Sequence, residues 1–469
     1  MRKSLLATAT AAVLGYLLVI PASAASAGPG APGIGDPYYP TYGNGGYDVS
    51  HYDLDLRYQP ATDTLSGTAT IRATATQGLT SFDLDFALTV GKVTVDGRPA
   101  HFATSGEQEL VVTPDRTLPR GRPFTVTVTY TGVPSGVQRY GFTSWQRTAD
   151  GGVAANEPES AWWWFPSNDH PLDKATYDVT VRVPEGEQAI SNGLLVSQHT
   201  AGGWTGYHWR QDAPQATYLA TLAVGHFDIT HSRTRTGVPV INAYSTALPA
   251  TTAANARKGV EQTADIIDFL STWFGPYPFD AAGGYVPDVP SHFSLEAQTR
   301  VFYSPSVFAT ADGNGTVAHE LSHQWWGDDV SLERWSDIWL NEGFATYGSW
   351  LWAEHQGGPT TQQAARQTYD SYPADDPFWT VKPGDPGPDK QFDDAVYDRG
   401  AVAIQALRTT IGDPAFRALL RAWPAQHRYG NGTIAEFRAL AERLSGRDLG
   451  TFFTTWLYTP LKPSALPGA

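Results

Sequence analysis

Strict alternation of apolar and polar side chains limits the first half of this chain to β-strands. In the run Phe124-Thr-Val-Thr-Val-Thr-Tyr130 every second residue is apolar, and Tyr177-Asp-Val-Thr-Val-Arg-Val183 repeats the pattern. Successive side chains of a strand point to opposite faces, so such runs are half-buried strands with one wet face. Turn residues separate the runs, as in Val95-Asp-Gly-Arg-Pro99. Because no helical period interrupts them, the sequence predicts an antiparallel β domain over residues 47–232.

The hydrophobic period changes after residue 232. Val260, Ala264, Ile267 and Leu270 fall on one face of a helix, and Gly275 with Pro276 provides a stop signal. A chain of 469 residues is long enough for two cores. We therefore expect an α+β, multi-domain protein whose second, mixed α/β domain covers residues 233–469.

The N-terminus has the features of a secretory signal peptide. Arg2 and Lys3 precede an apolar run from Leu5 to Ile20, and small residues then allow cleavage after Ala24 or Ala27. An uncleaved membrane anchor is the alternative, but the run is short for a span. We expect residues 1–27 to be a signal peptide, the protein to be secreted and extracellular, and no stable membrane insertion to remain after cleavage. Residues 28–46 are rich in Gly, Pro and Tyr and predict a flexible lead-in.

The composition excludes several kinds of site and partner. The chain has no cysteine, so disulfides, thiol catalysis and cysteine zinc sites are absent. The formal net charge of −15 argues against nucleic acid as a partner, because phosphate binding requires a basic surface. Acidic pairs such as Asp328-Asp329 and Asp393-Asp394 are expected to be solvated rather than to hold calcium.

One stretch of the second domain predicts a metal centre. His319 and His323 stand four residues apart, which places both imidazoles on one face of a helix, about 5–6 Å apart at Cβ. Glu320 lies near that face but not on it, and Glu342, in the next predicted helix, is a natural third ligand. Three protein ligands leave a tetrahedral position open, which is typical of catalytic rather than structural zinc.

The same stretch resembles a known family. His-Glu-Leu-Ser-His-Gln-Trp-Trp-Gly from His319, followed by Trp-Leu-Asn-Glu-Gly-Phe-Ala around Glu342, resembles the zinc signature of the aminopeptidase-N-like gluzincins. These are zinc metallopeptidases of clan MA, a family that includes leukotriene hydrolase. The resemblance implies a thermolysin-like catalytic domain, one Zn²⁺ per chain on His319, His323 and Glu342, and Glu320 as the catalytic base. It covers roughly residues 47–463, without the C-terminal helical domain common in the family.

Further residues acquire roles through this resemblance. Glu157, in Asn156-Glu-Pro-Glu, and Glu296, in Leu295-Glu-Ala-Gln298, match the positions that hold the free amino group of the substrate. Tyr397, in Ala395-Val-Tyr-Asp-Arg-Gly-Ala401, matches the tyrosine that stabilises the transition state. From spacing alone, Thr346 lies one turn after Glu342, where it can orient a zinc-binding histidine.

The expected function is that of a secreted zinc aminopeptidase acting on peptides with a free N-terminus. A second interpretation keeps the site but changes the reaction, to endopeptidase cleavage or epoxide hydrolysis. A third is a non-catalytic binding module with a residual zinc site. That module would be expected to have lost the base or the tyrosine, yet both Glu320 and Tyr397 are present.

Overall fold

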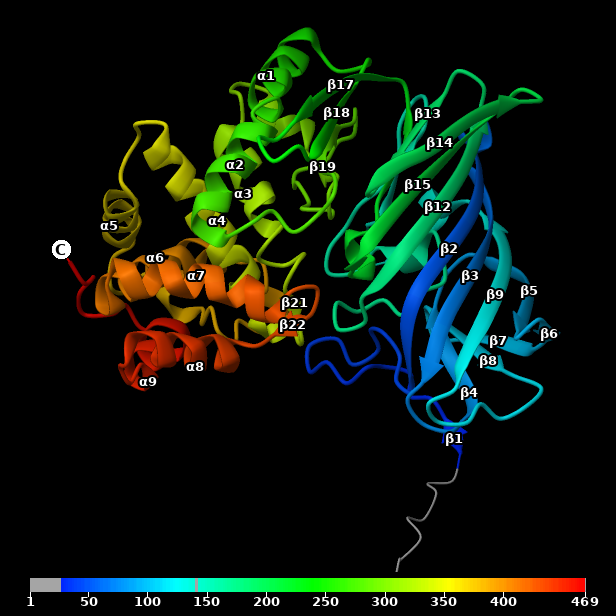
Figure 1. Ribbon diagram of the computed structural model, residues 1–469, viewed down its shortest axis with the longest axis horizontal. Helices are drawn as coiled ribbons and strands as arrows, with labels where there is room; N and C mark the ends of the chain where they lie inside the picture. The colour runs from blue at the N-terminus through cyan, green and yellow to red at the C-terminus, as the bar shows by residue number, and fades with distance from the viewer. Residues whose placement is uncertain (1–26, 140–141, 469) are drawn as a thin grey trace, which may run out of the picture.

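The computed structural model describes residues 27–139 and 142–468. The predicted signal peptide therefore lies outside the described residues, apart from Ala27. Strands fill one side of the molecule and helices the other, which confirms the two-domain α+β prediction (Figure 1). None of the helices in the described ranges is long and apolar enough to cross a membrane.

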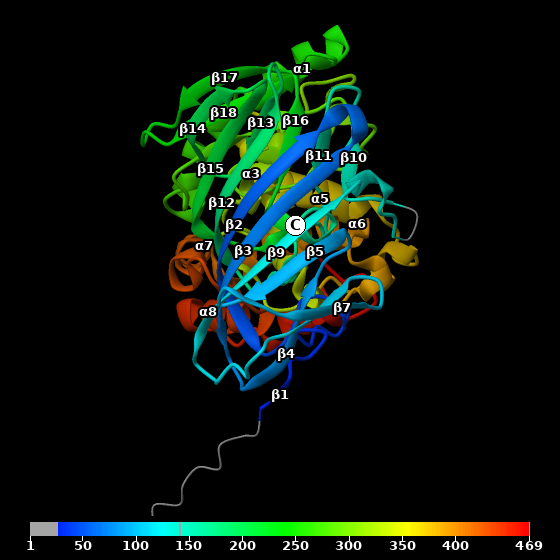
Figure 2. The same ribbon diagram turned by 90° about the vertical axis from the view of Figure 1, so that its right-hand side faces the viewer.

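The β domain is built on a long twisted sheet, seen face-on in Figure 2. In the described part of the chain this sheet has eight strands. In sheet order they are β14 (Leu194–Ala201), β15 (Trp204–Gln215), β12 (Ala175–Pro184), β2 (Tyr47–Gln59), β3 (Thr64–Ala75), β9 (Pro123–Gly132), β5 (Thr89–Val95) and β6 (Arg98–Pro99). Neighbouring strands are antiparallel except β2 and β12, which run parallel.

The alternating runs lie in this sheet as the pattern predicts. A row of side chains crosses five strands in register: Val179 is opposite Leu54, Leu54 opposite Ala69, Ala69 opposite Val128, and Val128 opposite Val93. All five side chains are buried. One face of the sheet therefore supplies the core, and the threonines of β9 lie on the other face.

Two smaller sheets complete the β domain. The first contains β1 (Gly28–Pro29), β4 (Leu79–Asp85), β8 (Glu109–Thr113) and β7 (His101–Ser105). The second contains β10 (Trp145–Arg147), β11 (Gly152–Ala154), β16 (Leu222–Gly225) and β13 (Gln188–Ser191). Most of the second sheet is buried, and the segment that follows β11 carries Glu157.

The second domain begins earlier than the predicted residue 233. β17 (Phe227–Arg233) pairs with β18 (Pro239–Ser245), in a sheet that continues through β19 (Ala282–Val286) and β20 (Val301–Phe302). This sheet belongs to the second domain, so the boundary falls at about Phe227. The two-residue period of a β-strand continues through β17, so the sequence pattern placed this strand in the first domain.

Helices make up most of the second domain. Within the described ranges they are α1 (Ala250–Val260), α2 (Thr263–Phe274), α3 (Asn314–His323), α4 (Trp339–His355), α5 (Thr361–Ser371), α6 (Asp394–Ile411), α7 (Asp413–His427), α8 (Ile434–Ser445) and α9 (Gly450–Phe453). A short parallel pair joins β21 (Ser331–Leu332) to β22 (Asn431–Gly432). Gly275, at φ +100°, ends α2 where the sequence predicts the stop.

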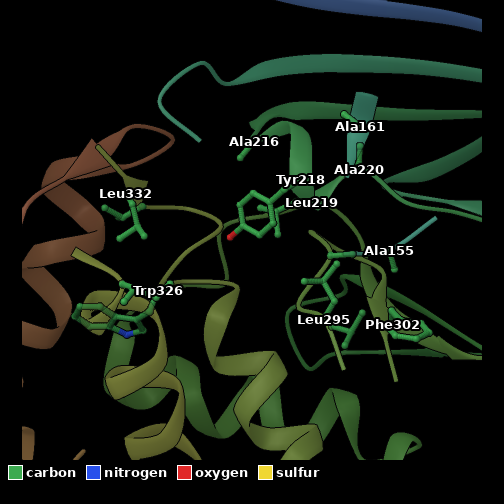
Figure 3. Packing of buried hydrophobic residues seen from close by; sticks show 14 of the residues in the cluster. Ala155, Ala161, Ala216, Tyr218, Leu219, Ala220, Leu295, Phe302, Trp326 and Leu332 are labelled. Carbon is green, nitrogen blue, oxygen red and sulfur yellow. The ribbon is translucent and has the colours of Figure 1, made fainter. Parts of the chain in front are cut away.

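The two domains share one continuous core. Figure 3 shows part of it, where Ala155 and Tyr218 of the β domain belong to the same buried cluster as Leu295 and Phe302 of the second domain. The buried guanidinium of Arg300 crosses the junction. It donates to the carbonyl oxygen of Gly193 at 2.9 Å on one side and to that of Ile241 at 2.7 Å on the other.

The segment of residues 28–46 differs from the predicted flexible lead-in. β1 adds to the edge of β4, and Asp36 and Asn44 are buried. Asp36 accepts a hydrogen bond from the backbone N–H of Trp335, in the second domain. Gly and Pro set the turns of this segment, but its polar and aromatic side chains find buried partners far away in sequence, which its composition does not reveal.

Candidate active site

The metal-binding side chains come from two packed helices. His319 and His323 lie one turn apart near the end of α3, and Glu342 lies in the first turn of α4. The Nε2 atoms of the two histidines are 3.2 Å apart. Oε2 of Glu342 is 3.2 Å from Nε2 of His319 and 3.4 Å from Nε2 of His323. The predicted ligand set is therefore brought together.

These distances fit a zinc ion. Two atoms that each lie about 2.0–2.2 Å from a tetrahedral zinc are roughly 3.3–3.6 Å apart. The three ligand atoms have nearly this separation, and two imidazoles with one carboxylate form a nitrogen and oxygen donor set suited to zinc.

Further contacts orient both histidines. Nδ1 of His323 donates to the carbonyl oxygen of Trp326 at 3.0 Å, which leaves its Nε2 free of hydrogen for a metal. Nδ1 of His319 faces Oγ1 of Thr346 at 3.4 Å, the position for which the sequence predicted an orienting residue. Such contacts fix the tautomer and the ring orientation of metal-binding histidines.

The charges of this centre favour an ionised Glu342. Burial alone would raise the pKa of Glu342, but the nearby His323 and the hydrogen bonds of both histidines outweigh burial and lower that pKa to about 2. Glu320, buried beside the triad, has its pKa raised well above the ordinary value, mainly by burial. A carboxylate with a raised pKa is a better proton acceptor, which suits a general base.

Tyr397 completes this side of the cavity. It lies in the first turn of α6, and its ring stacks on that of His319, with centroids 5.9 Å apart and planes 20° apart. Burial and then the carboxylates of Glu342 and Glu157 raise the pKa of Tyr397 well above its ordinary value. The hydroxyl therefore keeps its proton and remains a hydrogen-bond donor.

Two carboxylates reach the same cavity from different domains. Glu157 comes from the β domain and Glu296 from the second domain. Tyr218 donates to Oε1 of Glu296 at 2.9 Å, and Gln324, next to His323, donates to the Glu296 carbonyl at 2.9 Å. Among the described residues, Oε1 of Glu157 is buried without a hydrogen-bond partner. Burial, followed by repulsion from Glu296, raises the pKa of Glu157 well above its ordinary value.

These residues surround one cavity of about 400 Å³. Its walls are formed by Asn156, Glu157, Phe293, Ser294, Leu295, Glu296, His319, Glu320, His323, Glu342, Phe392 and Tyr397. The carboxyl groups of Glu157 and Glu296 can bind a cation together, and two exposed phenylalanines, Phe293 and Phe392, add apolar surface. The cavity thus combines a metal centre with a place for a positive charge.

Sequence reasoning missed part of this site. Asp328 and Asp329, expected to be solvated, are buried. The ammonium of Lys174, from the β domain, donates to their backbone carbonyls at 2.7 and 3.0 Å and holds the turn that follows α3. Burial lowers the pKa of Lys174 to about 8. A single lysine ahead of a strand carries no signal of this role. Of the other acidic pair, Asp393 accepts from the N–H of Ala395 and caps α6.

Comparison with protein families identifies both halves of the chain. Residues 49–219 match the model of the peptidase M1 N-terminal domain, and residues 294–456 match that of the peptidase family M1 domain. The chain belongs to peptidase family M1. This agrees with the resemblance to the aminopeptidase-N-like gluzincins.

Solved structures of M1 proteins share this fold. The M1 zinc metallopeptidase from Deinococcus radiodurans is 31% identical, with a TM-score of 0.83, and the match covers 93% of this chain and 99% of that one. A mutant of that metallopeptidase, bound to a Tyr-Ser-Ala substrate, is 30% identical, with a TM-score of 0.82 and the same coverage.

Curated M1 relatives are longer. Aminopeptidase M1-B of Oryza sativa subsp. japonica is 26% identical over 86% of this chain and 49% of its own length. Human endoplasmic reticulum aminopeptidase 1 is 27% identical over 81% of this chain and 44% of its own length. The chain thus spans about half the length, or less, of the curated relatives it matches.

Proposed function

We propose that this M1 protein is a zinc-dependent aminopeptidase that removes residues from the N-terminus of peptides. One observation carries the proposal: a triad with zinc-like spacing shares a cavity with two carboxylates that converge from different domains. The aminopeptidase names of the relatives and the tripeptide bound by the Deinococcus radiodurans mutant support it.

The triad would hold the metal, one ion per chain. Bound zinc lowers the pKa of a coordinated water to about 7 and polarises a carbonyl group. Glu320, next to the triad, accepts the proton of the attacking water and passes it to the leaving amine. The Tyr397 hydroxyl, which keeps its proton, donates a hydrogen bond to the carbonyl oxygen as that atom gains charge.

The two cavity carboxylates define where the substrate begins. Burial raises the pKa of both Glu157 and Glu296, and repulsion from Glu296 raises that of Glu157 further. A peptide α-ammonium placed between them stabilises their ionised forms. Fixing the ammonium sets its distance to the scissile bond, so cleavage occurs after the first residue. An acetylated N-terminus has no charge and leaves both carboxylates without a cation.

The test compares a free-amine peptide with its acetylated twin, with and without a chelator, by mass spectrometry. We expect stepwise loss of N-terminal residues from the free peptide alone, abolished by the chelator and restored by zinc. Internal cleavage of both peptides at similar rates would instead assign an endopeptidase. Hydrolysis of an epoxide without peptide cleavage would assign the other reaction, and absence of both would leave a binding module.

A matched pair of variants isolates the anionic site. Glu296→Gln keeps an oxygen for the Tyr218 hydroxyl but removes the charge. Glu261→Gln is the control, because Tyr244 donates to Oε1 of Glu261 at the same 2.9 Å, at an exposed position in the second domain. Losing one partner of a buried charge pair costs about 2–5 kcal/mol, so kcat/KM should fall at least thirtyfold in the first variant and stay unchanged in the control.

We also propose that the enzyme is exported. The basic start, apolar run and small residues of residues 1–27 support secretion. N-terminal sequencing of protein recovered from the culture medium tests this, with Ala25 or Gly28 expected as the first residue. A chain that starts at Met1 and stays with the cells would contradict it.

A further inference from the structure

The segment of residues 36–42, here called the junction segment, lies between the two domains. In Figure 1 it is the dark-blue loop between β2 and the short strands β21 and β22. Its contacts reach the β domain through His170, and the second domain through Trp335 and the chain between residues 385 and 391. The aminopeptidase mechanism described above does not use it.

Asp36 anchors the junction segment. Its Oδ2 accepts from the backbone N–H of Trp335 at 2.8 Å and lies 3.2 Å from Nε2 of His170. Its Oδ1 accepts from the N–H groups of Tyr38 and Tyr39 at 2.7 and 3.1 Å. The Asp36 carboxylate and the His170 imidazole are both completely buried. One aspartate therefore joins both domains and sets the direction of the two tyrosines that follow.

The two tyrosines bind the chain that leads to the active site. The Tyr38 hydroxyl donates to Oδ1 of Asp385 at 2.6 Å and accepts from the N–H of Gly387 at 2.7 Å. The Tyr39 hydroxyl donates to Oε1 of the buried Gln391 at 2.7 Å. The Tyr39 ring is itself held by stacking on Tyr42, with centroids 4.4 Å apart.

Gln391 is next to residues that form the cavity. Phe392, the following residue, is 39% exposed and lines the cavity wall. Asp393 then caps α6, whose first turn carries Tyr397. The hydrogen bond from the Tyr39 hydroxyl to the Gln391 side chain therefore limits the movement of both Phe392 and the start of α6.

We propose that Tyr39 is a positioning residue for the reaction: through its hydrogen bond to Gln391 it fixes Phe392 and the N-terminus of α6 at the substrate cavity. Tyr39 itself is not among the residues that line the cavity. The part of this inference that concerns kinetics rests on the proposed aminopeptidase function, whereas the part that concerns the position of the loop does not.

The test replaces one hydroxyl. Tyr39→Phe removes the bond to Gln391 and keeps the stacked ring. Tyr244→Phe is the control, because it removes a tyrosine hydroxyl bonded to a side-chain oxygen, that of Glu261, elsewhere in the second domain. The first readout is trypsin cleavage after Lys390, whose side chain is 53% exposed and which directly precedes Gln391. The second is the KM and kcat of a peptide substrate.

We expect Tyr39→Phe to speed trypsin cleavage at Lys390 roughly three- to tenfold, as the net loss of one hydrogen bond would open the loop more often. KM should rise by a similar factor, because Phe392 lines the cavity. The kcat should stay within about twofold, because Asp393 still caps α6 and holds the turn that carries Tyr397. The control should change neither quantity.

Three outcomes would overturn the inference. The first is that Tyr39→Phe shows trypsin cleavage at Lys390 and a KM no higher than those of the control. The second is faster trypsin cleavage of Tyr39→Phe with an unchanged KM. The third is an equal fall in melting temperature and activity in Tyr39→Phe and Tyr244→Phe. A wild-type protein that hydrolyses no peptide would overturn the proposed function instead. The trypsin rates would then still decide whether Tyr39 holds Gln391.

Discussion

Replacing Thr346 with valine isolates the contact that orients one zinc ligand. The change removes the hydroxyl that faces Nδ1 of His319 at 3.4 Å and keeps the branched shape of a side chain that is only 8% exposed. The His319 ring then loses a contact that selects its tautomer, and Nε2 is less often available to the metal. His323 is unaffected, since its Nδ1 is bonded to the backbone carbonyl of Trp326.

The size of the effect follows from the geometry. Loss of a partner of this kind costs 10–100-fold in metal affinity. The distance of 3.4 Å is longer than the usual 2.7–3.2 Å of an N–H···O bond, so the lower end of that range applies. We expect zinc affinity to fall about tenfold, which corresponds to about 1.4 kcal/mol.

Competition with a chromogenic zinc chelator measures this affinity. At saturating zinc, kcat should remain within about twofold of the wild type, since neither Glu320 nor Tyr397 is changed. Thr410→Val is the control, because that hydroxyl bonds only a carbonyl of its own helix, that of Ala406, among the contacts of the described residues. Equal zinc affinity in both variants, or a loss of activity that excess zinc does not restore, would refute the reasoning.

Three further predictions concern Glu320, Tyr397 and a buried carboxyl group of the β domain, Glu109. Glu320→Gln should keep one zinc per chain by metal analysis and lose turnover, because an amide cannot accept the proton of water; near-normal kcat would exclude Glu320 as the base. Tyr397→Phe should lower kcat by about 10²–10³ while its ring still stacks on His319; unchanged kcat would remove the hydroxyl from the mechanism. Burial, followed by the charge of Asp83, raises the pKa of Glu109 from 4.5 to about 8. The folded state thus holds a proton that the unfolded state loses, so stability should fall as pH rises from 4.5 through 8. Glu109→Gln should flatten this fall in thermal melts at pH 5 and pH 8, and an unchanged slope would contradict it.

The zinc triad was predictable because the spacing of its residues along the sequence is enough to bring them together. The spacing of His319 and His323 places them on one helix face whatever surrounds that helix, and Glu342 lies on the next helix along the chain. The alternating runs were equally informative, since Val126 and Val128 of β9 are buried as their period requires. Local spacing therefore predicts both the strands and the metal ligands.

Features that depend on distant partners were not predictable in this way. Glu157 meets Glu296 only because the domains dock, and only the family resemblance placed it. Asp36 lies in a Gly- and Pro-rich segment, yet its partners, His170 and Trp335, are more than a hundred residues away. Asp328 resembles a surface residue in sequence, but the turn held by Lys174 buries it. Burial of a polar residue depends on what packs over it, which composition does not encode.

The walls of the cavity come from both domains, but the metal centre comes from the second domain alone. The zinc triad and Glu320 come from α3 and α4, whereas Glu157 and Asn156 belong to a loop of the β domain. Substitutions in that loop can change which amino termini are accepted while the metal centre stays constant. A mutant library at Asn156, with Glu157 kept, would therefore sample substrate preference while the zinc ligands and Glu320 stay unchanged.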